Sequence, residues 1–315
     1  MTAGAARVLA IVGATATGKT AVAEAAAEAL GGEIVCADSR QLYRELEVGT
    51  GKPTREERAA IPHHLFDALE LGERSTAGGY AAAAASVCGD ILARGRLPVL
   101  VGGSGLYLAA LTDGLSEEPP HDPELRARLE AEAARLGVPA LHARLQSVDP
   151  DSAARLHPGD RQRVTRALEV YQASGRTLTW WHRARPTRGL AAAWTTIELV
   201  VPAALLDERI ATRTRAMFDG GLIEETAALV QAGRGEELAK LRAVGYDEAI
   251  ELLAGRIDRA EAERRTNLRT RRLAKRQRTW FRGRPHAARL DAHEAPAATL
   301  ARQVCAAYAG ASAGG

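Results

Sequence analysis

Eight consecutive residues near the N-terminus carry the clearest chemical signal in the sequence. They match the phosphate-loop pattern G-x-x-x-x-G-K-[ST] and read Gly13, Ala14, Thr15, Ala16, Thr17, Gly18, Lys19 and Thr20. An apolar run over 7–12 precedes them and an Ala-rich stretch over 20–30 follows, so we expect a buried strand, the loop and a helix. Backbone N–H groups and the helix N-terminus would then surround the phosphates of a ligand. Lys19 would add a positive charge, and Thr20 would offer its hydroxyl to Mg²⁺.

Two further apolar runs, over 33–37 and 97–101, end in segments that could face the same ligand. Asp38, Ser39, Arg40 and Gln41 follow the first run, and a glycine-rich turn containing Ser104 follows the second. The carboxyl ends of parallel strands meet at one edge of an open α/β sheet, where ligands bind. Asp38 could act there as a general base or a metal-linked carboxylate. It could equally be a helix N-cap, and the spacing leaves both open.

Composition restricts the class of protein. Hydrophobic residues make up 46% of the 315 residues, which is ample for a packed core. The three cysteines, Cys36, Cys88 and Cys305, are scattered without metal-ligand spacing, which argues for a reducing compartment. The sequence shows neither a signal-peptide pattern nor an apolar run long enough to span a membrane. We therefore expect a cytoplasmic protein with no membrane partner.

The pattern of apolar residues changes in the middle of the chain. From about residue 117 the pattern is helical, and no strand-like run returns until 195–201. We therefore predict an α/β fold with a P-loop NTPase-like parallel sheet core flanked by helices, interrupted by an all-helical insertion. The predicted bounds are 1–116 for the first part of the core, 117–194 for the insertion and 195–315 for the second part of the core with basic C-terminal helices.

Basic residues are concentrated in two places. Arg161, Arg163 and Arg166 lie at the start of a predicted helix in the insertion, and the segment 256–284 contains 12 basic residues against three acidic ones. Such helices are either solvated surfaces or surfaces that bind a phosphate backbone. The charge imbalance, with Trp280 and Phe281 at its end, favours nucleic acid for the second segment.

Several motifs in fixed order resemble one family, the bacterial tRNA dimethylallyltransferases, also called tRNA isopentenyltransferases. The resemblance is collinear from about residue 8 to about residue 284. It includes two departures, since Ala14 stands where many members have proline and Ser104 where they often have threonine. Both keep the needed chemistry. Besides the phosphate loop, the resemblance depends on the segments 38–43, 49–53, 102–107, 157–158, 162–169, 244–246 and 273–282.

The resemblance implies an activity and roles for individual residues. The family transfers a dimethylallyl group from dimethylallyl diphosphate to the exocyclic amine of the adenosine 3′-adjacent to the anticodon, in tRNAs that read codons beginning with U. Asp38 would be the base, and Lys19, Thr20-bound Mg²⁺ and Arg213 would stabilise the leaving diphosphate. The phosphate loop would hold the diphosphate. The implied tRNA contacts are Asp38, Ser39, Arg40, Gln41, Ser104, Arg126, Gln162, Arg163, Val164, Thr165, Arg166 and Lys275.

Three other functions would account for only part of these sequence features. A small-molecule kinase or an adenylate isopentenyltransferase would use the phosphate loop but would not need the inserted helices. A non-catalytic nucleic-acid-binding protein would leave the intact Lys19-Thr20 pair and Asp38 unexplained. The expected partners are therefore tRNA and dimethylallyl diphosphate, and the expected state is a monomer.

Overall fold

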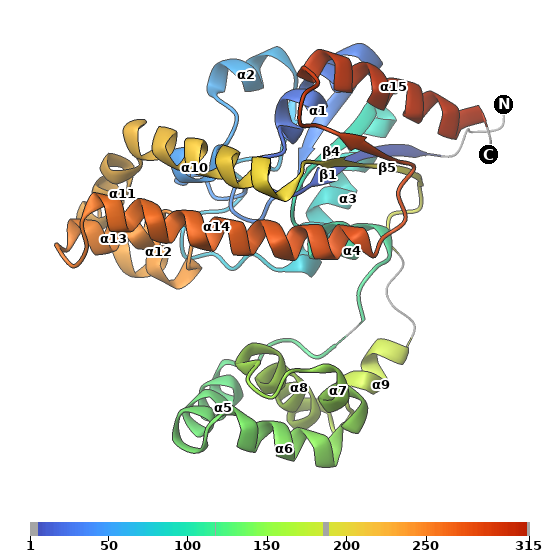
Figure 1. Cartoon of the computed structure of the whole chain (residues 1–315). Helices are drawn as coiled ribbons and strands as arrows, with labels where there is room; N and C mark the ends of the chain where they lie inside the picture. Colours follow the sequence, from blue (N-terminus) through green and yellow to red (C-terminus); the bar gives the residue numbers. More distant parts are fainter. Residues whose placement is uncertain (1–5, 117, 185–188, 314–315) are drawn as a thin grey trace. The chain divides into compact units, whose positions relative to one another are not determined.

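The chain forms two compact units. The computed structural model describes residues 6–116, 118–184 and 189–313. The residues up to Thr112 and those from Leu190 onward contact one another and form one unit, which we call the core unit. Residues Asp113–Gly189 form the other, which we call the inserted unit (Figure 1). These bounds lie a few residues N-terminal to the predicted 117–194. The shift arises because Leu190 already hydrogen-bonds through its amide to Leu111 O in the core unit.

A parallel sheet forms the centre of the core unit. Its described strands lie in the order β3-β2-β4-β1-β5-β6, and all neighbouring pairs are parallel. The predicted α/β class with a parallel sheet is confirmed. The strand bounds are β1 (Arg7–Gly13), β2 (Gly32–Cys36), β3 (His63–His64), β4 (Leu97–Gly102), β5 (Ala193–Val200) and β6 (Ala288–Asp291).

Alternating residues of β1 enter two apolar layers. Leu9 and Ile11 belong to the layer that includes Val22 of α1 (Lys19–Leu30) and Val304 of α15 (Ala297–Ala313). The intervening residues of β1 join the other layer, with α3 (Ala77–Ala93) and α4 (Gly105–Thr112). Helices therefore cover both faces of the sheet (Figure 1), as expected for buried parallel strands.

The rest of the core unit extends beyond the carboxyl ends of the strands. The long helices α10 (Ala203–Asp219) and α14 (Arg259–Arg282) contact each other there. A smaller apolar cluster around Tyr43, Leu46 and Tyr246 joins shorter helices to them. The shorter elements of the core unit are η1 (Val48–Thr50), α2 (Arg55–Ala60), α11 (Leu222–Gln231), α12 (Gly235–Leu241) and α13 (Tyr246–Leu253).

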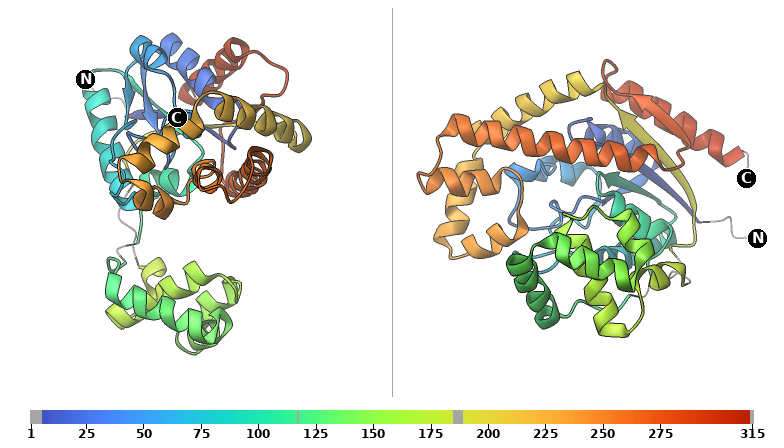
Figure 2. Two further views of the ribbon diagram at one scale, coloured as in Figure 1. Left: turned by 90° about the vertical axis from the view of Figure 1, so that its left-hand side faces the viewer. Right: turned by 60° about the horizontal axis from the view of Figure 1, so that its bottom comes forward.

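The regular secondary structure in the described part of the inserted unit is all helical. Its apolar core includes Leu129, Leu141, Leu145 and Leu168. Most of its helices begin at a side chain that caps the first turn, as Asp122 does by accepting from the amides of Glu124 and Leu125. Figure 2 shows these helices packed into a bundle. They are α5 (Pro123–Leu136), α6 (Val138–Val148), α7 (Pro150–Arg155), α8 (Arg161–Ser174) and α9 (Leu178–Arg183).

Among the described residues, no helix combines the length and the apolar character that crossing a membrane would need.

Candidate active site

The phosphate loop turns from β1 into α1 through two residues with left-handed backbone angles. Ala16 and Gly18 adopt left-handed backbone angles, with φ of 63° and 84°, which turn successive N–H groups toward one side. The ammonium of Lys19 donates to the carbonyl of Ala14 at 2.8 Å, and the buried Thr17 hydroxyl donates to the same carbonyl at 2.9 Å. Ala14 and Thr17 therefore shape the loop, while Lys19 crosses it.

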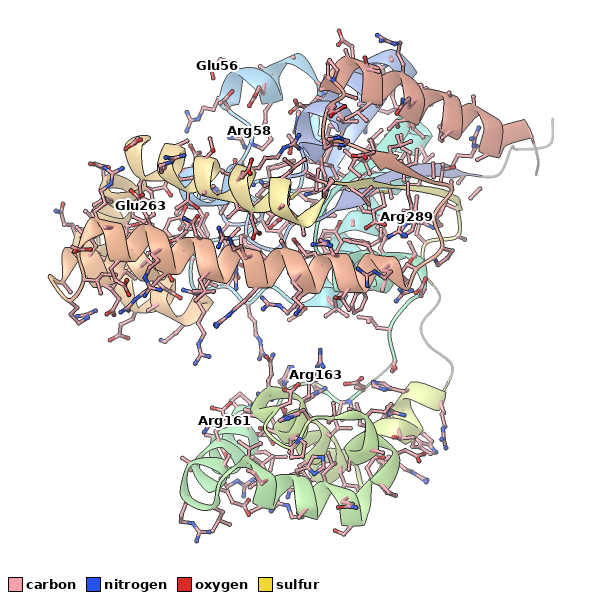
Figure 3. All side chains as sticks on the ribbon, viewed as in Figure 1. Glu56, Arg58, Arg161, Arg163, Glu263 and Arg289 are labelled. Atoms are coloured by element: carbon pink, nitrogen blue, oxygen red, sulfur yellow. The ribbon has the colours of Figure 1, made fainter. Side chains whose placement is uncertain are left out.

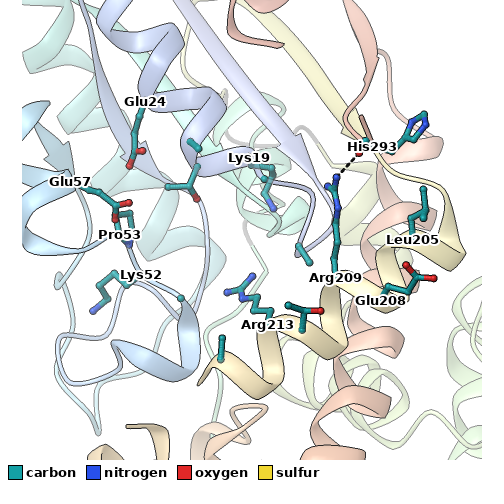
Figure 4. A pocket seen from close by; sticks show the side chains of 17 residues that line it. Lys19, Glu24, Lys52, Pro53, Glu57, Leu205, Glu208, Arg209, Arg213 and His293 are labelled. Carbon is teal, nitrogen blue, oxygen red and sulfur yellow. Dashed lines mark hydrogen bonds between the residues drawn. The ribbon is translucent and has the colours of Figure 1, made fainter. Parts of the chain in front are cut away.

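The loop opens on a cavity of about 770 Å³, which we call the loop cavity (Figure 4). Its positive lining comes from three separate parts of the chain: Lys19 of α1, Lys52 and the α10 residues Arg209 and Arg213. Of these, Lys52 is buried and its ammonium donates to Tyr43 O at 2.8 Å and to Asp67. Lys52 therefore holds the chain around it in place rather than presenting a free charge.

A second cavity of about 280 Å³ lies at the carboxyl ends of β2 and β4, and we call it the strand-end cavity. It brings together the sequence-predicted residues that follow these two strands, because β2 and β4 are neighbours in the sheet. They are Asp38, Ser39, Arg40, Gln41 and Ser104.

Hydrogen bonds fix the two strand-end turns to each other. The hydroxyl of Ser104 accepts from the Ser39 amide at 3.0 Å, and Asp38 Oδ1 accepts from the Arg40 amide at 2.9 Å. Asp38 therefore caps a turn, not a helix, and no described residue donates to its Oδ2. Gln41 donates to the carbonyls of Thr50 and Gly51 at 3.2 and 3.1 Å. The carboxylate of Asp38 is thus held in place with one oxygen available in the cavity.

The two cavities adjoin, because Lys19, Thr20, Gly51 and Arg213 line both. Arg213 donates to Thr15 Oγ1 at 3.1 Å and to Thr50 O at 2.8 Å. Gly51 has a φ of 57°, and a Cβ there would collide with the Arg213 guanidinium. A side chain at this position would therefore displace the group that joins the two cavities.

The electrostatics of the shared wall favour an anion. Burial lowers the pKa of Lys19 to about 8, although the charge of Asp38 opposes this shift and that of Arg213 adds to it. Burial also lowers the pKa of Arg213. No carboxylate of the described residues forms an ion pair with either cation. An anionic ligand would supply the missing counter-charge.

The loop cavity also contains residues suited to Mg²⁺. Thr20 lines it together with Glu24, Glu57 and Glu208, but no described group of three His, Cys, Asp or Glu residues is arranged to hold a metal. Mg²⁺ usually keeps several waters and binds through one or two protein groups plus substrate phosphates. A single hydroxyl beside a phosphate loop fits that mode of binding.

Several residues of the strand-end cavity were not selected from the sequence. They belong to 242–246 and α14, far along the chain, and reach the site only through long-range packing. For all of them except Arg242 and Thr270, the one usable signal was their presence in the ordered motifs at 244–246 and 273–282. They are Arg242, Val244, Tyr246, Thr270, Leu273 and Gln277. Lys275, which the sequence analysis names as a tRNA contact, is exposed on α14 and does not line this cavity.

The predicted tRNA-binding residues of the inserted unit fall into two groups, those that are buried or ion-paired and those that are exposed. Val164 and Thr165 are fully buried in its core, and Arg126 and Arg166 each lie 3.3 Å from the carboxylate of Glu169. Gln162 and Arg163 are exposed, Arg163 by 74% of its side chain. Figure 3 shows Arg161 and Arg163 at the surface of the unit.

Burial alone would raise the pKa of Glu169. The hydrogen bond from the Asp122 amide and the charges of His121 and Arg166 outweigh that effect and hold the pKa below its usual value. The partners of Glu169 are thus arranged around an ionised carboxylate.

Fold and site together define an α/β protein of the phosphate-loop NTPase type whose anion site opens on a second, carboxylate-bearing cavity. Comparison with known proteins narrows this class. The family model described as IPP transferase matches residues 41–284, and the one described as isopentenyl transferase matches residues 6–71.

The chain is 52% identical over 276 residues to a tRNA dimethylallyltransferase of Anaeromyxobacter dehalogenans, covering 88% of this chain and 92% of that protein. It is 48% identical over 289 residues to that of Halorhodospira halophila, covering 91% and 93%. The crystal structure of a tRNA isopentenylpyrophosphate transferase from Bacillus halodurans superposes with a TM-score of 0.70 at 32% identity, covering 98% of each chain. The chain therefore belongs to the IPP transferase family, that of the tRNA dimethylallyltransferases, and the predicted resemblance is confirmed.

Proposed function

We propose that this enzyme transfers a dimethylallyl group from dimethylallyl diphosphate to the exocyclic amine of the adenosine 3′-adjacent to the anticodon, in tRNAs that read codons beginning with U. The observation that carries the proposal is the shared wall of the two cavities. Lys19, Thr20, Gly51 and Arg213 face both the anion site and the cavity that contains Asp38. Dimethylallyl diphosphate with its diphosphate on the loop would thus point its prenyl carbon toward an adenine held near Asp38.

The residues of this wall, together with Asp38 of the strand-end cavity, account for the chemical step. A bond forms between the adenine nitrogen and the first prenyl carbon, and the bond from that carbon to the diphosphate oxygen breaks. The diphosphate leaves with the bonding electron pair, and Lys19 and Arg213 stabilise its growing charge. Asp38 accepts the proton that the amine loses.

Mg²⁺ belongs to the proposal as the metal of the loop cavity. Thr20 would hold it together with the donor phosphates, and when bound it neutralises charge on the leaving diphosphate. The loop residues 13–20 would bind that diphosphate through their amides, apart from the Thr15 amide, which donates to Gln277.

The acceptor part of the proposal concerns tRNA. The target adenosine must leave the stack of the anticodon loop to reach a cavity at the sheet edge. Asp38 to Gln41 and Ser104 would contact it there, and Lys275 and the exposed residues Gln162 and Arg163 would bind the anticodon stem-loop. We further propose that the enzyme acts as a monomer in the cytoplasm.

One label-tracing experiment tests the proposal. The protein is incubated with Mg²⁺ and either prenyl-labelled dimethylallyl diphosphate or γ-labelled ATP, each with unmodified tRNA or with adenosine monophosphate. We expect label only in tRNA and only from the prenyl donor. Label in adenosine monophosphate instead would indicate an adenylate prenyltransferase, and transfer of the γ-phosphate would indicate a kinase.

A further inference from the structure

One buried amide joins the phosphate loop to the turn that follows β4. Gln277 of α14 is only 9% exposed. Its Oε1 accepts from the Thr15 amide at 2.8 Å, and its Nε2 donates to the carbonyl of Gly103 at 3.0 Å. Both functional atoms of one side chain are therefore used, one on each of two loops that are distant in sequence.

The glycines of the β4 turn are explained by what packs against them. A Cβ on Gly103 would collide with the Gln277 amide, one on Gly105 would collide with the Trp280 ring, and one on Gly102 would collide with the backbone of Ala37. Two of the three glycines thus make room for side chains of α14. The turn and the helix are fitted to each other at the position where Gln277 makes its hydrogen bonds.

Both ends of this junction lead to groups that the reaction uses. On one side, Thr15 accepts through its hydroxyl from Arg213 at 3.1 Å. On the other side, Ser104 follows Gly103 and accepts from the Ser39 amide, next to Asp38. The hydrogen bonds of Gln277 therefore lie between the anion-binding wall and the turn that carries the base.

We propose that Gln277 is a positioning residue that fixes the phosphate loop and the β4 turn at the separation that prenyl transfer requires. The inference rests on the proposed function and deepens it. The side chain of Gln277 lines the strand-end cavity, but its described hydrogen bonds go to backbone groups of the two loops. Its loss should therefore change the alignment of the two substrates more than their binding. A misplacement of about 1 Å can reduce a rate by roughly 10²-fold.

The test uses variants on both sides of the junction. Gln277→Met keeps the length and packing of the side chain but removes both hydrogen bonds. Gly103→Ala leaves Gln277 in place but pushes its amide away, and its Cβ would also lie 3.2 Å from Gly13 O. The double variant completes a mutant cycle. Thr279→Ala is the matched control, because the Thr279 hydroxyl is exposed and makes its one hydrogen bond to a described residue within α14, to Lys275 O at 2.9 Å.

Each protein is assayed for single-turnover transfer to tRNA, and for binding of a non-reactive prenyl diphosphate analogue and of tRNA by calorimetry. We expect the single variants to lose roughly 10²-fold in rate per binding-competent site, while both affinities change less than about threefold. The double variant should be no slower than the slower single variant. Thr279→Ala should match the parent.

Two results would overturn the inference. A purely structural role would lower the melting temperature and the fraction of binding-competent protein and leave the rate per competent site unchanged. Independent roles would give a double variant whose loss is the product of the single losses. If Gln277→Met does not fold, Gly103→Ala decides between the same outcomes by rate against affinity. Failure of the parent to transfer any prenyl group would instead refute the proposed function.

Discussion

Two carboxylates, one in each unit, face arginines in opposite ways. Asp38 in the core unit acts electrostatically on Lys19 and Arg213 but forms no ion pair with either among the described residues. Glu169 in the inserted unit is fully buried and is bound by His121, Arg126, Arg166 and the Asp122 amide. The first carboxylate leaves nearby charge uncompensated, and the second neutralises it.

Arginines in this chain therefore differ in how available their charge is to a ligand. Positive charge that is already paired, as at Arg126 and Arg166, maintains the fold and is less available to a ligand. Positive charge that bonds only to hydroxyls and backbone carbonyls, as at Arg213, needs a counter-ion from outside.

Asp38→Asn should abolish most of the activity. The amide keeps the size of the side chain but cannot accept the proton, so turnover should fall by roughly 10²–10⁴-fold with prenyl diphosphate affinity retained. Single-turnover transfer and calorimetry measure the two quantities. A near-normal transfer rate would remove Asp38 from the role of base.

Arg213→Met should reduce transfer by roughly 10²–10³-fold, the usual effect of losing one preorganised charge-stabilising donor. Because the buried guanidinium lacks a carboxylate partner, its replacement should not lower the melting temperature. Arg166→Met is the matched comparison and should lower stability in the inserted unit. Equal thermal effects in the two variants would contradict the contrast between paired and unpaired arginines.

Glu169→Gln should destabilise the inserted unit by roughly 3 kcal/mol, the low end for breaking a buried pair, since its partners are partly exposed. The pKa of Glu169 is lowered on folding, so its stabilisation is complete above the usual carboxyl range. It is lost as the pH falls through the lowered pKa. Hydrogen exchange of residues 113–189 at neutral and acid pH measures this. The variant should lose protection at neutral pH and show a weaker acid dependence than the parent.

Reversing the charge of Arg161 and Arg163 should have the smallest effect. We expect weaker tRNA binding and a salt dependence whose slope is shallower by about one for each lost phosphate contact. Prenyl diphosphate binding should not change. Arg135 and Arg183, exposed in the same unit, give a control double reversal with the same change in net charge. Identical salt slopes in both double variants would show that Arg161 and Arg163 of α8 do not contact tRNA phosphates.

The central part of the fold was predictable because its signals are local. Apolar runs at 7–12, 33–37, 97–101 and 195–201 correspond to β1, β2, β4 and β5. The edge strands β3 and β6 were missed, since one has two residues and the other, Ala288–Asp291, alternates in polarity. Short edge strands are defined by pairing with a neighbour, which a local pattern does not contain.

The site was predictable in part for the same reason. The phosphate loop, Asp38 and Ser104 follow strands directly, so topology places them at one edge. Gln277 and Tyr246 reach that edge from distant helices, and spacing alone did not select them. The pairing of Arg166 with Glu169, by contrast, was available from their separation of three residues on one helix.

The central claim is that a prenyl group passes from the loop cavity to an exocyclic amine in the strand-end cavity. The most direct measurement compares two anticodon stem-loops that differ at the nucleoside 3′-adjacent to the anticodon, adenosine in one and purine riboside, which lacks the amine, in the other. Both are incubated with the enzyme, Mg²⁺ and labelled dimethylallyl diphosphate, and the nucleosides are then separated. We predict one labelled nucleoside, at that adenosine, and none from the purine stem-loop. Equal labelling of both stem-loops, or label in neither while the donor is bound, would contradict the account.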